Sequence, residues 1–168
     1  MLRQGTPQDA AQICDIYNHY VRETTVTFEE APVSEADMAQ RIADTVSRLP
    51  WLVWEEGTVI LGYAYAAPWK ARAAYRHAVE ASIYLAHSAT GRGLGTKLYE
   101  ALIADLRQRD IHCVIGGAAL PNPASFALHE RLGFSKVAEF REVGFKFGRR
   151  VSVAYWELVL DRVAKRRQ

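Results

Sequence analysis

A glycine-rich segment in the middle of the chain restricts its fold more than any other feature. Residues 90–96 read Thr-Gly-Arg-Gly-Leu-Gly-Thr and lie between an apolar run at 81–86 and a helical pattern that begins near Lys97. A strand, a glycine turn and a helix start in succession can hold an anion. The first N–H groups of a helix have no partner inside the helix and lie at the positive end of its dipole. Glycines let the backbone approach a phosphate closely.

The spacing of these glycines disfavours two common nucleotide sites. The dinucleotide fingerprint is G-x-G-x-x-G, and the P-loop is G-x-x-x-x-G-K-[ST]. Gly91, Gly93 and Gly95, followed by Thr96 and Lys97, fit neither pattern. A dinucleotide or a triphosphate is therefore not the expected ligand.

Length and composition predict one domain over residues 1–168. The chain has 168 residues, of which 49% are hydrophobic, and this is enough for a well-developed core. The formal charge of +2 is too small to collect nucleic acid unaided. Basic residues gather near the C-terminus and predict a solvated tail at about 162–168.

Cysteine usage and hydropathy indicate a cytoplasmic protein. Cys14 and Cys113 form neither a disulfide framework nor a metal-binding spacing, so we expect buried, reduced thiols and no metal. Residues 1–6 lack the apolar segment of a signal peptide, and no apolar run approaches about 18 residues. Export and membrane insertion are therefore not supported.

Apolar periodicity predicts a mixed α/β chain of the α+β class with a mostly antiparallel sheet. Thr6 and Pro7 resemble a helix start, Ser34 caps a second helix, and further helices are expected from near Lys97 and at 124–132. Strands are expected at residues 2–4, 51–55, 59–67, 79–86, 112–118, 134–143 and 151–160. Aromatic residues at strand positions are expected in the core or in a subunit contact: Trp51, Trp54, Tyr63, Tyr65 and Trp156.

Two segments that lie one strand apart resemble the GNAT superfamily of N-acetyltransferases. YLAHSATGRGLG at 84–95 is similar to the acetyl-CoA pyrophosphate loop of that superfamily, Q/R-x-x-G-x-G/A, and NPASFALHERLGF at 122–134 is similar to its asparagine, helix and GF ending. The resemblance covers essentially the whole chain. It implies a GNAT fold, with helices on both faces of the central sheet, and acetyl-CoA as co-substrate. Thr90 departs from the pattern, which has Gln or Arg at this position.

Four further segments look like the phosphinothricin acetyltransferase branch. They are TTVTFEE at 24–30, WKARAAYRHAVEASIYL at 69–85, LHERLGF at 128–134 and VGFKFGRR at 143–150. Enzymes of this branch acetylate small amino acids such as phosphinothricin, methionine sulfone or methionine sulfoximine. The resemblance therefore implies a small amino-acid-like acceptor and a homodimer.

The resemblance also implies which residues bind acetyl-CoA. The strand at Ile83, Tyr84 and Leu85 would offer backbone groups to the pantetheine arm, as an added peptide strand would use them. Asn122 would bond the pantetheine, and it can also cap the following helix. The pyrophosphate would be held by Gly91, Arg92, Gly93, Leu94, Gly95 and Thr96.

Acetyl transfer to an amine needs a proton acceptor, because an α-ammonium with a pKa of about 8 is mostly charged at pH 7. The resemblance places Glu80 near the thioester as this base, and a strand-edge carboxylate paired with an arginine is the alternative. His129 occupies the position where many GNAT enzymes have a tyrosine that protonates the departing thiolate. A structural histidine is the alternative there.

An amino-acid acceptor carries an anion, which basic side chains can bind by charge-assisted hydrogen bonds. Lys70, Arg72 and Arg76 are the candidates, and Phe28 could supply an apolar wall. Glu80 and its neighbours complete the predicted acceptor site, which comprises Phe28, Lys70, Ala71, Arg72, Arg76, Glu80, Ala81 and Ser82. Two other functions remain open. One is acetylation of a protein lysine or N-terminus, and the other is a non-catalytic module that senses acyl-CoA.

Overall fold

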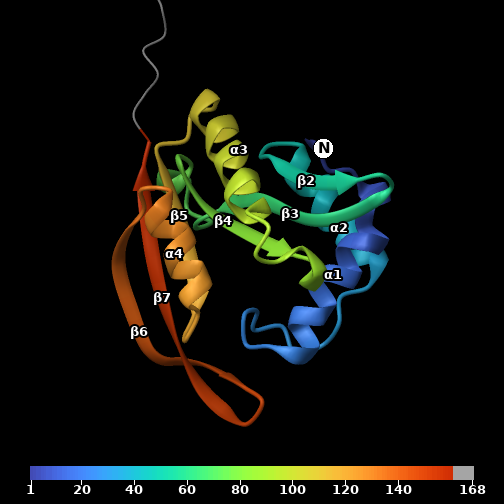
Figure 1. The fold of residues 1–168 in the computed structure, drawn as a ribbon. Coiled ribbons are helices and arrows are strands. Elements are labelled where there is room, and N and C mark those ends of the chain that lie inside the picture. The colour runs from blue at the N-terminus through green and yellow to red at the C-terminus, as the bar shows by residue number, and fades with distance from the viewer. Residues whose placement is uncertain (161–168) are drawn as a thin grey trace, which may run out of the picture.

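The computed structural model describes residues 1–160, so the basic tail predicted at 162–168 lies outside the described residues. A seven-stranded sheet crosses the molecule in the order β1-β2-β3-β4-β5-β7-β6 (Figure 1). Only β4 and β5 pair in parallel, which confirms the mostly antiparallel sheet. The strands are β1 (Leu2–Gln4), β2 (Trp51–Glu56), β3 (Val59–Pro68), β4 (Ala78–Leu85), β5 (Cys113–Ala119), β6 (Ser135–Lys146) and β7 (Arg149–Val159).

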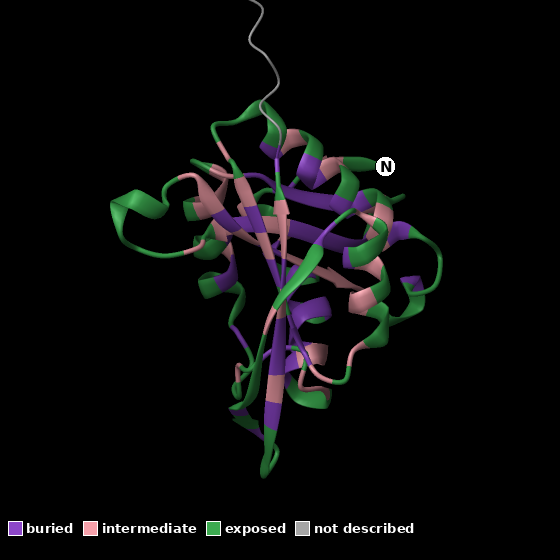
Figure 2. Cartoon of the chain, turned by 90° about the vertical axis from the view of Figure 1, so that its left-hand side faces the viewer, coloured by how far each residue is buried: buried purple, intermediate pink, exposed green. Residues whose placement is uncertain are grey.

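Helices cover both faces of the sheet, as the resemblance implies. One face packs against α1 (Ala10–Glu23) and α2 (Glu35–Val46), and the other packs against α3 (Leu94–Gln108) and α4 (Pro123–Arg131). Short 3₁₀ turns occur at η1 (Pro7–Asp9), η2 (Ala73–Tyr75) and η3 (His87–Ala89). Figure 2 shows buried strand residues between these layers. No described helix has both the length and the apolar character needed to cross a membrane.

The two cores confirm most of the predicted aromatic positions. Trp51 and Tyr63, which are 2% and 1% exposed, belong to the core beneath α1 and α2. Trp156 is 0% exposed and belongs to the core beneath α3 and α4. Burial of such large apolar side chains on both faces of one sheet makes the hydrophobic effect the main source of stability here.

The parallel pairing of β4 and β5 is short, and this opens the sheet. The two strands are paired only from Ala78–Cys113 to Ala81–Gly116. Beyond that point β4 continues beside β3, and β5 continues beside β7. The inner edges of β4 and β5 therefore diverge into a space that we call the cofactor wedge. Backbone groups along these edges need partners and can bind a ligand.

Three predicted boundaries differ from the structure by three residues, and several others differ by one or two. The glycine-turn helix α3 begins at Leu94 rather than near Lys97, because Gly93 is its N-cap in the left-handed conformation, with φ of 74°. β6 continues to Lys146 rather than ending at Val143, because a bulge between Phe140 and Gly144 lets the pairing with β7 resume. The segment after Thr6 first forms the turn η1, so α1 begins three residues later than the Pro7 signal suggests.

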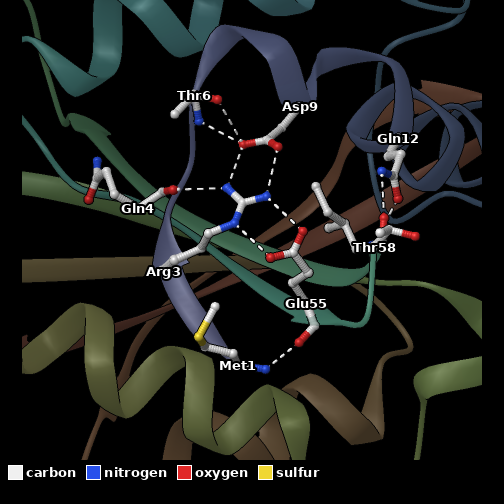
Figure 3. A network of polar contacts seen from close by, with 9 residues as sticks. Met1, Arg3, Gln4, Thr6, Asp9, Gln12, Glu55 and Thr58 are labelled. Atoms are coloured by element: carbon white, nitrogen blue, oxygen red, sulfur yellow. Dashed lines mark hydrogen bonds and ion pairs between the residues drawn. The ribbon is translucent and has the colours of Figure 1, made fainter.

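A polar network fixes the short strand β1 to its neighbours. Figure 3 shows the Arg3 guanidinium between the carboxylates of Asp9 and Glu55. Its nitrogens donate to both oxygens of Asp9 at 2.9 Å and to Glu55 Oε2 at 2.9 Å. These bonds hold the pKa of Asp9 below its usual value. A three-residue strand gains little from its own ladder, so this charge-assisted clamp positions the turn from which α1 starts.

Candidate active site

The cofactor wedge contains a cavity of about 460 Å³. It lies between the diverging ends of β4 and β5, with the glycine turn at one end and α4 along one side. Most residues predicted to bind acetyl-CoA line it, namely Ile83, Tyr84, Leu85, Gly91, Gly93, Gly95, Thr96 and Asn122. The sequence prediction therefore identified a set of residues that the fold brings together.

The glycine turn is shaped by backbone conformation rather than by crowding. Gly91 and Gly93 each have φ of 74°, a region that side chains with a Cβ rarely adopt, and added Cβ atoms there would meet nothing within 4 Å. Gly93 caps α3, so the first-turn N–H groups of Leu94, Gly95 and Thr96 have no partner within the helix. This end of the cavity can bind an anion.

Two predicted cofactor residues direct their side chains elsewhere. Arg92 Nη2 donates to both carboxylate oxygens of Glu56 at 2.9 Å. Leu94 is 4% exposed and packs in a small apolar cluster with Leu61 and Ala89. Their contribution to the anion site is therefore restricted to the backbone in this arrangement.

Asn122 and Thr90 both line the cavity, and each already makes a hydrogen bond within its own turn. Asn122 Oδ1 accepts from the Ser125 N–H at 3.0 Å, which makes Asn122 the cap of α4, and the residue also lines the cavity. Thr90 lines it too, but its hydroxyl donates to His87 O at 2.9 Å. The Thr90 side chain is thereby directed to its own turn.

Glu80 lies where β4 and β5 are about to separate. It pairs with Ala67 of β3 on one side and Ile115 of β5 on the other, so β4 is an inner strand here and not a sheet edge. A Cβ added at Gly117 would lie 3.4 Å from Glu80 Oε1, which places the carboxylate directly over this glycine. Burial raises the pKa of Glu80, and the charge of Lys70 opposes that rise.

No ion pair within residues 1–160 involves Glu80. The alternative of a strand-edge carboxylate paired with an arginine therefore does not describe this residue. A half-buried carboxylate that makes no ion pair is a stronger base than an exposed one and is suited to accept a proton.

His129 is held on both ring nitrogens. It is 3% exposed, stacks on Trp156 with centroids 5.2 Å apart, and its Nδ1 lies 2.7 Å from Ser125 O. A carbonyl oxygen only accepts, so we assign the proton to Nδ1 and the lone pair to Nε2. The Tyr99 hydroxyl, 3.3 Å away, then donates to Nε2. Burial lowers the pKa of His129 and favours this neutral form.

Gly116 makes room for this imidazole. A Cβ added at Gly116 would lie 2.1 Å from His129 Nε2, far inside van der Waals contact. Tyr99, which is 0% exposed, completes the enclosure and lines the cavity together with His129. Sequence reasoning did not single out Tyr99 or Gly116, because an apolar position on α3 and a glycine in a strand carry no distinctive signal.

The exposed predicted acceptor residues lie in two separate connections, with Phe28 between α1 and α2 and residues 69–76 between β3 and β4, and we call these two segments together the acceptor rim. Lys70 Nζ lies 4.6 Å from the centre of the Trp69 ring, and Trp69 meets Tyr155 edge to face at 5.6 Å. Tyr155 packs over Gly117, beside Glu80. These contacts bring one end of the rim to the catalytic candidate.

The other predicted acceptor residues are placed less closely. Arg72, Arg76 and Ala71 are exposed in the connection between β3 and β4, and no hydrogen bond or ion pair of the described residues joins them to Glu80. Ala81 and Ser82 lie further along β4 and line the cofactor cavity. Phe28 is 39% exposed, and its ring lies against Gly144 of β6.

Residues 2–152 match the family model of the acetyltransferase (GNAT) domain. The chain belongs to this family. This GNAT protein is 41% identical over 160 residues to the phosphinothricin N-acetyltransferase of Streptomyces coelicolor, with 93% of this chain and 94% of the relative covered. It is 34% identical over 171 residues to the L-methionine sulfoximine/L-methionine sulfone acetyltransferase of Salmonella typhimurium, covering 95% of this chain and 94% of the relative.

Solved structures agree with this assignment. A GNAT superfamily phosphinothricin acetyltransferase from Sinorhizobium meliloti, in complex with AcCoA, has a TM-score of 0.92 at 33% identity, covering 100% of this chain and 92% of that chain. The GNAT fold and the N-acetyltransferase class predicted from the sequence are thereby confirmed.

Proposed function

We propose that this GNAT acetyltransferase transfers an acetyl group from acetyl-CoA to the amino group of a small amino-acid-like acceptor, of the phosphinothricin or methionine sulfone and sulfoximine type. One observation carries the proposal. Glu80, a half-buried carboxylate of raised pKa, lies between the cofactor wedge and a rim of exposed cations. The names of the relatives support the same acceptor class.

The residues of the cofactor wedge fit acetyl-CoA. When bound, acetyl-CoA supplies an activated acyl group and a thiolate leaving group. The first-turn amides of α3 would bind its pyrophosphate, and the inner edge of β4 at Ile83–Leu85 would bond its pantetheine amides. Asn122 keeps one lone pair of its Oδ1 and its amide hydrogens for the same arm while it caps α4.

Glu80 is proposed as the general base of a direct transfer within a ternary complex. Its carboxylate would accept a proton from the acceptor ammonium, directly or through one water, and leave the neutral amine to attack the acyl carbon. A covalent enzyme intermediate is not invoked. Cys14 is 4% exposed, and its thiol donates a hydrogen bond to Val33 O. Burial raises the pKa of both Cys14 and Cys113. Neither cysteine is thus activated as a nucleophile.

For the departing thiolate we propose Tyr99 as the proton donor and His129, to which the resemblance gives this role, as the residue that positions Tyr99. The imidazole already directs its Nδ1 proton to Ser125 O, so the hydrogen on its Nε2 side is that of the Tyr99 hydroxyl. This pairing supports Tyr99 as the group that moves its hydrogen and His129 as the group that holds Tyr99 in place. Burial raises the pKa of Tyr99, so the hydroxyl is protonated before the transfer, and the tyrosinate left after it would regain a proton from solvent.

The acceptor rim is proposed to bind the anion of the acceptor. Lys70, Arg72 and Arg76 are exposed and have no ion-pair partner among residues 1–160, so their charges are available to a carboxylate or phosphinate. Exposed cations that can bind a carboxylate favour an amino acid over a protein amine, which lacks a free carboxylate beside the amine. The protein-acetylating alternative is therefore the second candidate.

A homodimer is proposed from the apolar surface of the last hairpin. Val137, Phe140, Val143, Phe145 and Phe147 are 50–63% exposed on or next to β6, the edge strand of the sheet. Exposed apolar residues along an unpaired edge are typical of a subunit contact. We further propose that the protein works in the cytoplasm, where the free thiols of Cys14 and Cys113 would persist.

A screen of amino-acid analogues tests the proposal. Purified protein would be mixed with acetyl-CoA and each of phosphinothricin, L-methionine sulfone, L-methionine sulfoximine, the parent amino acids and a lysine-containing peptide, and thiol release would be recorded. The expected result is turnover with the sulfone, sulfoximine or phosphinate and none with the peptide. Turnover with the peptide alone would favour protein acetylation. Calorimetric binding of acetyl-CoA without turnover of any amine would favour the sensor.

A further inference from the structure

The tip of the β6–β7 hairpin contacts the loop that carries Phe28. In Figure 1 this hairpin extends beyond the other strands, and its tip lies at the same end of the molecule as the connection between α1 and α2. The tip is the segment VGFKFGRR, to which the reaction as described above assigns no role. Its residues contact the loop of residues 24–28 at two points.

Lys146 is the first contact. It is 1% exposed, and its Nζ donates to Thr24 O and Thr27 O, each at 2.8 Å. A buried ammonium that bonds two carbonyls of one loop fixes the path of that loop, because releasing either bond would leave a buried charge poorly satisfied. The ammonium also lies 4.9 Å from the centre of the Phe147 ring, which adds a cation–π contact.

Gly144 is the second contact. A Cβ added there would lie 2.3, 2.4 and 2.9 Å from three atoms of the Phe28 ring. The ring therefore rests on the bare backbone of β6. No positive φ requires glycine at this position, so the missing side chain serves the packing of Phe28 rather than the conformation of the strand.

The same loop reaches the reaction site on its other side. Val26 lines the cofactor cavity, and the hydroxyl of Thr27 bonds the Tyr17 hydroxyl at 2.8 Å. Tyr17 meets Tyr84 edge to face at 5.0 Å, and Tyr84 belongs to the strand that carries Glu80. A shift of the loop would therefore move Phe28 at the rim and change the packing against Tyr84 of β4.

We propose that Gly144 and Lys146 are specificity-determining positioning residues, which act by holding the loop of residues 24–28 and the ring of Phe28 against the acceptor. This inference rests on the proposed small-acceptor function. Gly144 sets how far the ring can withdraw from the acceptor, and Lys146 sets the path of the backbone that carries it.

Kinetics on two acceptors test the role of Gly144. Gly144→Ala is expected to push the Phe28 ring aside and to change the ratio of kcat/KM for L-methionine sulfone and phosphinothricin by about fivefold or more, with acetyl-CoA affinity within about twofold. In a Phe28→Ala background the same substitution should leave the ratio unchanged, because the ring that it displaces is gone. An unchanged ratio in the first background, or an equal change in both, would overturn the proposal.

Lys146 is tested by two substitutions and a control. Lys146→Met should raise the acceptor KM about tenfold, with a smaller change in kcat, and Lys146→Arg should recover part of the loss. Lys136→Met, on the same strand but exposed and paired with Glu139, should behave as wild type. Size-exclusion chromatography of each variant identifies any change in oligomeric state. A KM for Lys146→Met equal to that of Lys136→Met would contradict the role.

Hydrogen–deuterium exchange makes the inference independent of turnover. The amides of Val26 and Glu29 donate to the hydroxyls of Thr24 and Thr27 within the loop that Lys146 holds. Exchange over residues 25–30 should be faster in Lys146→Met, or in Lys146→Arg if the first variant does not fold, and unchanged in Lys136→Met. Equal exchange in all three would overturn the proposal. Absence of turnover in the wild-type protein would refute the proposed function alone.

Discussion

The cofactor wedge and the acceptor rim lie next to each other but are built in different ways. The wedge is formed mainly by backbone groups and buried side chains of β4, β5, α3 and α4, and the sheet split that creates it is part of the fold. The rim is formed by exposed side chains of two connections that are far apart in the sequence. A fold can therefore keep its cofactor site while its acceptor site changes, because loop residues change without disturbing a core.

Glu80 is the point where the two regions meet, and its substitution should have the largest effect. Glu80→Gln removes the proton acceptor, so kcat is expected to fall by about 10²–10⁴-fold while acetyl-CoA affinity is retained. In the wild-type protein the rate should fall as the pH decreases through the raised pKa of Glu80, because the protonated carboxyl group accepts no proton. Steady-state rates from pH 5 to 10 would show whether the variant has lost this acidic limb.

Glu157→Gln is a matched control for Glu80. Ile115 of β5 pairs with Glu80 of β4 on one side and with Glu157 of β7 on the other. The substitution Glu157→Gln therefore removes a neighbouring carboxylate from the same sheet. We expect wild-type rates for this variant. Equal losses in the two variants would contradict a specific role for Glu80.

Removal of the arginine charges of the acceptor rim should weaken acceptor binding and leave acetyl-CoA binding in the cofactor wedge unchanged. The double substitution of Arg72→Gln and Arg76→Gln is expected to raise the acceptor KM by about 10–100-fold, which corresponds to a loss of about 1.4–2.8 kcal/mol for the two exposed, solvent-screened contacts together. The affinity for acetyl-CoA should not change. Arg107→Gln, at an exposed position in the last turn of α3, removes a similar charge elsewhere and serves as control. A loss of acetyl-CoA affinity in the double variant would remove the distinction between the two regions.

The glycine turn offers the reverse test. Gly93→Ala places a Cβ on a left-handed residue at the cap of α3, which costs about 1–2 kcal/mol and is expected to weaken acetyl-CoA binding about five- to tenfold. Gly57, in the turn between β2 and β3, has φ of 63° and equally open surroundings. Calorimetry should find a loss of affinity in Gly93→Ala and none in Gly57→Ala, although both strain the backbone. Equal affinity in both would show that the cap conformation does not matter to the ligand.

The smallest effect concerns the stability of the wedge. His129 is buried with a lowered pKa, whereas an unfolded histidine binds a proton near pH 6.5. The unfolded state therefore binds more protons below that pH, and the free energy of unfolding should decrease as the pH falls from 7.5 to 5, by up to about 1.4 kcal/mol per pH unit. Urea unfolding measured at each pH should show that the free energy of unfolding depends less steeply on pH in His129→Gln than in wild type. Equal pH dependence of the free energy of unfolding in the two proteins would contradict this prediction.

Prediction from sequence succeeded where a local pattern determines the backbone. Gly91, Gly93 and Asn122 were recognisable because a left-handed turn and a helix cap require particular residue types at fixed offsets. These features lie within short segments, so one sequence is enough to predict them.

The remaining features depend on contacts between distant segments. The enclosure of His129 needs Gly116 from β5 and Tyr99 from α3, and the loop of Phe28 is held by Lys146, more than a hundred residues away in the sequence. Nothing in the local pattern around Lys146 distinguishes it from an exposed strand lysine such as Lys136. The pairing of β6 past its bulge brings Lys146 to that loop, and tertiary structure alone reveals it.

The contact between Gly116 and His129 also limits how this protein can diverge. The edge of the His129 imidazole occupies the space that an alanine methyl group would fill at position 116. Alanine at 116 therefore requires a smaller or displaced side chain at 129, and a larger ring at 129 requires glycine at 116. A library that randomises position 116 alone should therefore return mostly glycine. Introducing a side chain at position 116 is a two-site problem, to be searched with the codons for 116 and 129 varied together.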